Sequence, residues 1–436
     1  MRKPIAIGDL GTIITGKTPP TTNKNYYGDY AVFIKPTDIS EQCKFTYETE
    51  EMYSKLAAEK YESSLIPKGA ICVPCIGTIG TKMTMAPCDC YTNQSINSIV
   101  CNDRYDNEYV YYLIKNFLPG LKSYNLGTAS GREYVSKSNF EKIELVAEQD
   151  KTIQKKIGEF LSRYDSLIEN YQKQIKLLEE AAQRLYKEWF VDLHFPGHEN
   201  IKIVNGVPEG WEKKKISEVC DTIGGGTPST KVLSYYENGT ISWVTPTDIT
   251  KNNSLCLLST EKKITKEGLD HSSAKMLPAE TILMTSRASV GFFGICDFEV
   301  CTNQGFISCV PFDNNFQMYL LYNLMNRVEE IRIKAGGSTY LEISKSVFRN
   351  FDIICPKDDL ICLFQKEAHQ LLERMRMICK QIRLLTEARD RLLPKLMSGE
   401  IAVEGRRPER PLSCQPNGNA LGMETETNNR PVGAKD

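Results

Sequence analysis

Two short patterns in the chain match motifs that bind phosphate or metal. Residues Gly11–Thr18 have the Gly-x4-Gly-Lys-Thr spacing of a P-loop, in which the amides of the following helix hold the phosphates of a nucleotide. Pro19 and Pro20 follow at once. Each proline removes an amide and keeps the preceding residue away from helical geometry. We therefore expect a structural loop that faces a ligand, and a nucleotide hydrolase is the enzymatic alternative.

Cys72-Val73-Pro74-Cys75 has the C-x-x-C spacing of a zinc or thiol-redox site. The matching positions in the second half of the chain hold Leu283 and Ser286, which argues against a duplicated metal site. The four histidines have no ligand spacing, and no Gly-x-Ser-x-Gly or Asn-Pro-Pro-aromatic motif occurs. We predict that this chain has no catalytic constellation and no metal site.

The remaining polar residues are suited to DNA. Asn and Gln side chains bond adenine, Arg bonds guanine, and Lys contacts phosphates. A repeated Asn-Gln can equally pin a turn by side-chain hydrogen bonds, and the Tyr-Tyr pairs suit sheet packing better than base stacking. The predicted DNA-binding residues are Lys17, Lys35, Lys82, Asn93, Gln94, Arg132, Gly226, Thr227, Lys231, Arg287, Asn303, Gln304 and Ser338.

Several of these residues belong to an internal repeat with a period near half the chain. Gly-x-Thr-Pro at 16–19 recurs at 225–228, Pro-Thr-Asp-Ile at 36–39 recurs at 246–249, and Thr-Asn-Gln at 92–94 recurs at 302–304. An offset that stays nearly constant over this distance indicates a duplicated large domain, not a solenoid of short repeats.

Each repeat is followed by a long stretch with apolar residues at alternating steps of three and four, from 149 to 189 and from 364 to 396. This spacing predicts two helices of about 40 residues, roughly 60 Å long, that pair antiparallel and carry their charged residues on solvated faces. Two unrelated surface helices are the alternative. The predicted partner-binding residues on the helices are Tyr164, Tyr171, Leu178, Leu185, Leu371, Ile378 and Leu385.

The repeats themselves read as mixed α/β (α+β) domains. Short β-rich runs separated by turn residues predict strands at 31–35, 70–73, 241–244, 281–284 and 306–310. The expected organisation is a first globular domain at 1–147, a helix at 148–195, a second globular domain at 196–355, a second helix at 356–403 and a disordered tail at 404–436.

Composition limits the choice of function. The chain of 436 residues has 54 Lys and Arg against 55 Asp and Glu, so it lacks the strongly basic balance of many nucleic-acid binders. No apolar run is long enough for a membrane span, and no signal peptide is visible near Met1. Fifteen cysteines without such a signal indicate reduced thiols and a cytoplasmic protein.

The chain resembles the specificity subunit of a Type I restriction–modification enzyme over residues 5–403. The segments that carry the resemblance are Gly-x-Thr-Pro with its Tyr-Tyr, Trp243–Ile249, Ser286–Gly291, Asn303–Gly305, Leu185–Asp192, Val207–Trp211 and Arg391–Ile401. The first repeat departs from the pattern because Ile76 replaces the arginine found at Arg287. Arginine contacts are therefore not carried over to that half.

The resemblance implies a non-catalytic DNA reader. Each domain would bind one half of a bipartite asymmetric site, and the helices would set the spacer and dock two modification subunits that bind S-adenosylmethionine. Two restriction subunits that use ATP and Mg would join them, and no cofactor would bind this chain. The specificity subunit of a Type II (IIB/IIG-like) enzyme and a DNA-free coiled-coil scaffold are the alternatives.

Overall fold

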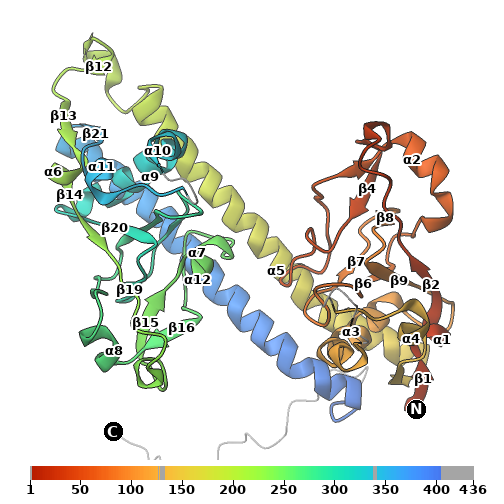
Figure 1. Cartoon of the computed structure of the whole chain (residues 1–436). Coiled ribbons are helices and arrows are strands. Elements are labelled where there is room, and N and C mark those ends of the chain that lie inside the picture. Colours follow the sequence, from red (N-terminus) through yellow and green to blue (C-terminus); the bar gives the residue numbers. More distant parts are fainter. Residues whose placement is uncertain (1, 126, 128–132, 337–340, 404–436) are drawn as a thin grey trace, which may run out of the picture.

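The computed structural model describes residues 2–125, 127, 133–336 and 341–403. Two globular domains sit at opposite ends of a pair of long antiparallel helices (Figure 1). This is the architecture that the repeat and the apolar spacing predict. The predictions made for Arg132, Ser338 and the tail at 404–436 lie outside the described residues.

The first domain is a mixed α/β unit whose core is a four-stranded sheet in the order β2-β9-β6-β7. A second four-stranded sheet, β3-β5-β4-β8, contains the parallel pair β4–β8, and β1 pairs antiparallel with β10. Its elements are β1 Arg2–Ala6, α1 Ile7–Leu10, β2 Gly11–Thr15, η1 Lys24–Tyr26, β3 Tyr27–Gly28, β4 Ala31–Ile34, β5 Met52–Tyr53, α2 Lys55–Lys60, η2 Glu62–Ser64, β6 Ile71–Pro74, β7 Thr84–Met85, β8 Tyr91–Thr92, β9 Ile96–Cys101, α3 Asn107–Phe117, η3 Leu118–Tyr124, α4 Lys137–Glu141 and β10 Glu144–Glu148.

The second domain repeats this plan with sheets β14-β20-β17-β18 and β16-β15-β19 and the pair β13–β21. Its parallel pair, β15–β19, matches β4–β8 of the first domain. Its elements, with the linker before it, are η5 His198–Asn200, β11 Ile203–Val204, β12 Val207–Pro208, β13 Glu212–Lys215, α6 Ile216–Val219, β14 Cys220–Gly224, η6 Leu233–Tyr235, β15 Ile241–Val244, α7 Pro246–Thr250, β16 Lys262–Ile264, α8 Lys266–Asp270, β17 Ile282–Thr285, β18 Phe293–Gly294, β19 Cys301–Thr302, β20 Phe306–Pro311, η7 Asn314–Phe316, α9 Gln317–Asn326, α10 Val328–Lys334, α11 Lys345–Arg349 and β21 Asp352–Cys355.

The five predicted strands are confirmed to within one residue at each end, as β4, β6, β15, β17 and β20. Their alternation of β-branched and aromatic residues fits a buried sheet, and turn residues stop each strand.

The two long helices are α5, Lys151–Tyr186, which continues into a π-helical turn, η4 Lys187–Val191, and α12, Asp358–Ser398. Asp150 caps the start of α5 by accepting the amide of Thr152 at 2.8 Å. Gly399 ends α12 with a positive φ of 83°, a conformation that glycine adopts without strain.

Each domain packs on the start of one helix and the end of the other. The core of the first domain takes in Ile157 and Leu161 from α5 together with Leu396 and Met397 from the end of α12. The core of the second domain takes in the end of α5 and the beginning of α12, where Phe364 is fully buried. The two domains are therefore related by an approximate twofold axis across the helix pair.

Two expectations about the helices were wrong in detail. The apolar spacing places Leu167 on the shared face of α5, but Leu167 is 38% exposed and Ile168 beside it is buried, seven residues after the buried Leu161. Charged residues are not confined to solvated faces, since Asp165 and Arg389 are buried between the helices. Arg389 forms an ion pair with one oxygen of Asp165, and the Tyr112 hydroxyl of α3 donates to the other.

The beginning of the chain closes on the end of α12. The Arg2 guanidinium donates to the carbonyls of Met397 and Leu396 at 2.8 and 2.9 Å. These carbonyls lie in the last turn of a helix, where a cation also interacts favourably with the helix dipole. The first strand therefore joins β10 to the end of α12.

Candidate nucleic-acid interface

Part of the predicted site in each domain lies where the Gly-x-Thr-Pro loop meets the Thr-Asn-Gln turn. The Lys17 amide donates to the Thr92 carbonyl at 2.9 Å, and in the second domain the Gly226 amide donates to the Thr302 carbonyl at 2.8 Å. These bonds join the Gly-x-Thr-Pro loop to the Thr-Asn-Gln turn in both halves. The sequence repeat is thus also a repeat of three-dimensional contacts.

An exposed threonine–glutamine pair stands on each joined turn. The Thr18 hydroxyl donates to Oε1 of Gln94, and the Thr227 hydroxyl donates to Oε1 of Gln304. Because the oxygen of each amide is engaged, its NH₂ group is oriented as a donor for another partner. Sequence reasoning named three of these four residues but missed Thr18 and the contact itself.

The neighbouring asparagines hold the turns in shape. Asn93 Oδ1 accepts the Ser95 amide at 3.0 Å, and Asn303 Oδ1 accepts the Gly305 amide at 2.9 Å. Such bonds are expected if the asparagines pin the turns, which is the alternative to a contact with DNA bases. A contact of either asparagine with a base stays a prediction.

The first glycine of each Gly-x-Thr-Pro loop is required because the backbone of the Thr-Asn-Gln turn lies too close to admit a side chain. A Cβ on Gly225 would lie 2.1 Å from the Asn303 carbonyl oxygen, and one on Gly16 would lie 2.1 Å from that of Thr92. We expect Gly225→Ala to lower the free energy of unfolding by about 1–3 kcal/mol, because backbone must move to admit the methyl group.

Urea denaturation measures this effect, and Gly224→Ala is the matched control. A Cβ on Gly224 meets nothing within 4 Å, so this neighbouring substitution should leave stability nearly unchanged. Equal stability of the two variants would contradict the close packing of the two turns.

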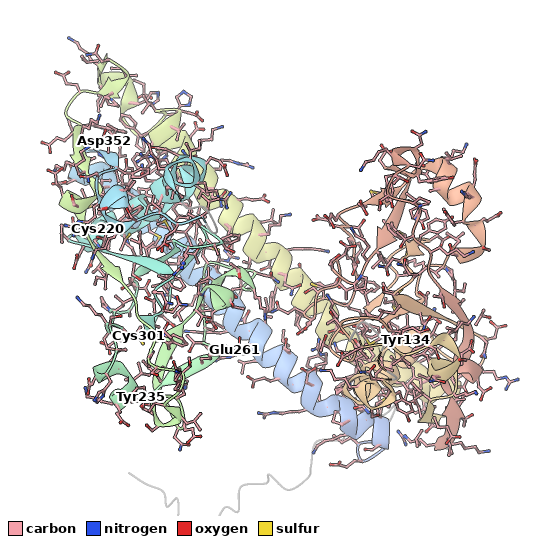
Figure 2. All side chains as sticks on the ribbon, in the orientation of Figure 1. Tyr134, Cys220, Tyr235, Glu261, Cys301 and Asp352 are labelled. Carbon is pink, nitrogen blue, oxygen red and sulfur yellow. The ribbon has the colours of Figure 1, made fainter. Side chains whose placement is uncertain are left out.

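The aspartate of Pro-Thr-Asp-Ile fixes a second loop in each domain. Asp38 accepts the Lys35 amide at 2.7 Å, and Asp248 accepts the Thr245 amide at 2.8 Å. The other oxygen of Asp248 accepts the amide of Glu261, labelled in Figure 2, at 2.8 Å. Sequence reasoning assigned no role to this aspartate, although its recurrence at a constant offset was the available signal.

The predicted phosphate-contacting lysines have different surroundings. Lys35 Nζ lies 2.6 Å from Glu50 and 3.2 Å from Glu51. Burial alone would lower the pKa of Lys35, but hydrogen bonds to the two carboxylates outweigh it and the pKa is raised. Lys17 and Lys231 are exposed, and Lys82 is half-buried. A phosphate contact stays a prediction for all four.

Arg287 lies on the loop after β17, where its guanidinium is 3.6 Å from the carboxylate of Glu342. Both side chains are about half exposed.

Gly226, the second residue of the Gly-x-Thr-Pro loop in the second domain, is buried. It contributes backbone shape and not a side-chain contact.

The P-loop alternative lacks the helix that it needs. Gly11–Thr15 is strand β2, and the next element after Lys17 and Thr18 is the short 3-10 turn η1 at Lys24. The amides that would hold phosphates in a P-loop are not arranged by any helix here.

The C-x-x-C pair lies inside the first domain. Cys72 is on β6 and Cys75 follows it, and burial raises the pKa of each thiol to about 12. The described part of the chain contains no group of three or more His, Cys, Asp or Glu arranged to hold a metal ion.

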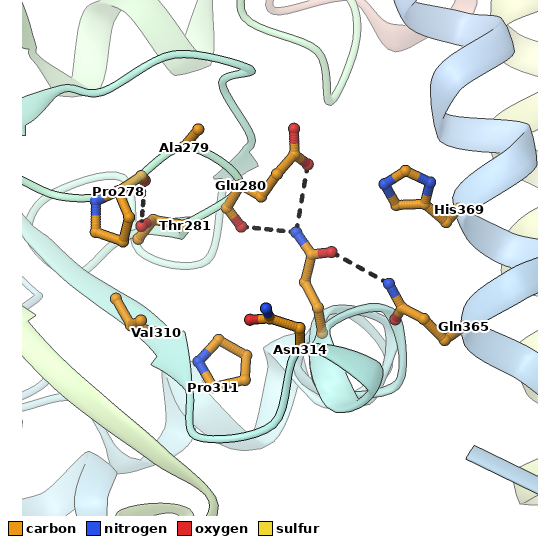
Figure 3. A pocket seen from close by; sticks show the side chains of 10 residues that line it. Pro278, Ala279, Glu280, Thr281, Val310, Pro311, Asn314, Gln365 and His369 are labelled. Carbon is orange, nitrogen blue, oxygen red and sulfur yellow. Dashed lines mark hydrogen bonds between the residues drawn. The ribbon is translucent and has the colours of Figure 1, made fainter. Parts of the chain in front are cut away.

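The second domain is joined to α12 by polar contacts around a cavity of about 340 Å³ (Figure 3). Gln317 Nε2 donates to the Glu280 carbonyl at 2.6 Å, and Gln365 Nε2 on α12 donates to Gln317 Oε1 at 3.4 Å. Glu280 also pairs with Arg376 of α12 at 2.8 Å. These contacts fix the domain on the helix that positions it.

Most of the predicted partner-binding residues pack inside the molecule. Ile378 is buried, and the other six are half-buried. Tyr171, Leu178, Leu185 and Leu371 pack against the core of the second domain. They hold the helices together, and a contact with another subunit stays a prediction for them.

The fold and the duplicated turns define a class of protein, in which two like α/β domains are held apart by an antiparallel helical spacer. The family model of the Type I restriction modification DNA specificity domain matches this chain twice, at residues 3–180 and 208–383. The chain therefore belongs to the family of Type I restriction–modification DNA specificity subunits.

Individual relatives agree with this assignment. The Type I restriction enzyme MjaIX specificity subunit of Methanocaldococcus jannaschii is 27% identical over 418 residues, covering 91% of this chain and 93% of its own. The HindI specificity subunit of Haemophilus influenzae is 30% identical over 198 residues, covering 45% and 42%. The crystal structure of the Type I S subunit from M. genitalium shares the fold, with a TM-score of 0.55 and 16% identity over 91% of this chain and 96% of that one.

Among the described helices, none combines the length and the apolar character that crossing a bilayer requires.

Proposed function

We propose that this chain is a non-catalytic subunit that reads a bipartite asymmetric DNA site, one half with each domain. The observation that carries the proposal is the placement of two like domains at opposite ends of the helix pair, each with the same exposed Thr–Gln pair. A rigid spacer between two readers suits a target whose specified bases lie in two separated blocks.

The approximate twofold axis supports this reading geometrically. The two strands of DNA are themselves related by local twofold axes, so two domains related in the same way can approach two half-sites in equivalent orientations. The net charge of −1 is consistent with weak binding by the chain alone, with partners adding cationic surface.

We further propose that two modification subunits dock on the helix pair, because two equivalent faces suit two identical partners. These subunits would carry S-adenosylmethionine and methylate adenine, and two restriction subunits would bring ATP and Mg. This chain would bind no cofactor itself, and the complex would work in the cytoplasm. Membership of the specificity family supports the choice of partners.

Exchange of one domain tests the proposal. Residues 1–148 are replaced by the first domain of another family member, with the junction after β10 because β1 pairs with that strand. Methylated adenines are then mapped across the genome of a host that carries the assembled enzyme. We expect one half-site of the methylated motif to change and the other half-site and the spacer to stay.

The reciprocal exchange, of the second domain alone, is the matched control and should change only the other half-site. A change of both half-sites in either chimera would contradict the assignment of one reader to each half. The absence of any sequence preference would instead favour a scaffold that does not contact DNA.

A further inference from the structure

The two domains share a loop whose backbone is held in the same way. In the first domain the Cys75 amide donates to the Ser95 carbonyl at 2.7 Å. In the second domain the Ser286 amide donates to the Gly305 carbonyl at 2.8 Å. We call these segments, 75–80 and 286–291, the matched loops.

The backbone of the matched loops agrees at the two positions that have a positive φ. Gly77 and its counterpart Ala288 both have a positive φ, of 83° and 61°. Gly80 and its counterpart Gly291 have φ values of 75° and 85°. Alanine is strained in the left-handed region. The loop of the second domain nevertheless holds this shape without glycine at Ala288.

One position within the matched loops differs in chemistry, and its partner differs with it. Ile76 forms a β-bridge with Tyr134, which is labelled in Figure 2. At the same place in the second domain, Arg287 forms a β-bridge with Glu342, and the two side chains form an ion pair. The same backbone position therefore carries an apolar–aromatic pair in the first domain and a cation–anion pair in the second.

The surroundings leave this pair available to a ligand. Arg287 and Glu342 are 49% and 50% exposed, and their closest nitrogen and oxygen lie 3.6 Å apart. An exposed pair at that distance is weak and readily gives up one partner. The Thr–Gln pairs, in contrast, are the same in both domains, so they cannot tell two different half-sites apart.

We propose that the matched loops discriminate between the half-sites, with Arg287 and Glu342 in the second domain and Ile76 and Tyr134 in the first as the specificity-determining residues. This inference rests on the proposed function. The guanidinium would take a hydrogen-bond acceptor edge, such as that of guanine in the major groove, with Glu342 orienting it. The apolar pair of the first domain would favour an apolar edge, such as a thymine methyl group.

Exchanging the pairs within this chain tests the inference. One variant carries Arg287→Ile and Glu342→Tyr, and the reciprocal variant carries Ile76→Arg and Tyr134→Glu. Each is assembled with the modification subunits in a host without other adenine methylation, and the methylated motif is determined by single-molecule sequencing. We expect each variant to change or relax its preference at one half-site by about tenfold, and the two variants to affect different half-sites.

Two results would overturn the inference. One is an unchanged motif at wild-type methylation levels. The other is an equal fall in methylation at every site with the motif intact, as a general phosphate contact would give. If the wild-type complex methylates no bipartite motif at all, the proposed function fails and not merely this inference.

Two further variants separate the effect from misfolding. Arg287→Gln keeps an exposed polar side chain on the same backbone, and it should relax the same half-site that Arg287→Ile with Glu342→Tyr affects. Glu342→Gln keeps the guanidinium and a hydrogen-bond acceptor beside it but removes the charge that orients it, so it should relax the same half-site less than Arg287→Gln does. A motif left intact by Arg287→Gln, in a variant whose thermal unfolding matches the wild type, would also overturn the inference.

Discussion

Inserting seven residues into each long helix is expected to lengthen the DNA spacer between the two half-sites by about three base pairs. Seven residues are close to two helical turns and add about 10.5 Å, while the rise of DNA is about 3.4 Å per base pair. The insertions belong after Asn170 in α5 and after Arg383 in α12. These positions lie between the contact of Asp165 with Arg389 and that of Glu280 with Arg376, so these two attachments survive. The contacts of Cys43 with Gln172 and of Gln42 with Asn253 would be lost.

The spacer is measured as the gap between the two blocks of the methylated motif. A four-residue insertion after Asn170 alone is the mismatched control, because it turns α5 by about 40° and shifts it by about 6 Å against an unchanged α12. We expect this control to abolish assembly or activity. An unchanged spacer with full methylation in the matched variant would show that the helix pair does not set the distance.

Replacing Arg389 by methionine is expected to lower the free energy of unfolding by about 3–5 kcal/mol, because it leaves the buried carboxylate of Asp165 without its cation. Asp165 and Arg389 have side-chain exposures of only 5%, and Tyr112 supplies the remaining hydrogen bond to the carboxylate. Urea denaturation of the purified chain measures the loss.

Arg383→Met is the matched control, since Arg383 is exposed on the same helix and should cost little. A triple variant with Asp165→Leu, Arg389→Met and Tyr112→Phe should recover much of the lost stability, because it buries no unpaired polar group. If Arg389→Met and Arg383→Met have equal stability, the buried pair does not hold the first domain to the helices.

The duplicated architecture could be predicted because its signals are local. Glycine and proline in Gly-x-Thr-Pro restrict a turn wherever they occur, and the structure uses the same turn twice. The steps of three and four residues likewise identify helices that share an apolar face. Local geometry of this kind is encoded in a few neighbouring residues, so a single sequence displays it.

The remaining features depend on partners distant in the sequence. Asp165 and Arg389 belong to helix sequences whose alternating charges are typical of a solvated helix. Only the packing of α3 against both helices reveals that these two side chains are buried. Thr18 and Gln94 form a pair because two turns meet across a sheet edge. Periodicity identifies a face of an element but not the residue that will cover it.

The packing of α12 against the first domain makes the order of protein synthesis matter. A chain emerging from the ribosome contains all strands of the first domain once Glu148 has been made, yet Leu393, Leu396 and Met397 complete that domain's core. Arg2 likewise forms its hydrogen bonds only after the carbonyls of the last turn of α12 have been made. The first domain therefore reaches its final packing only in a molecule that has also made the second.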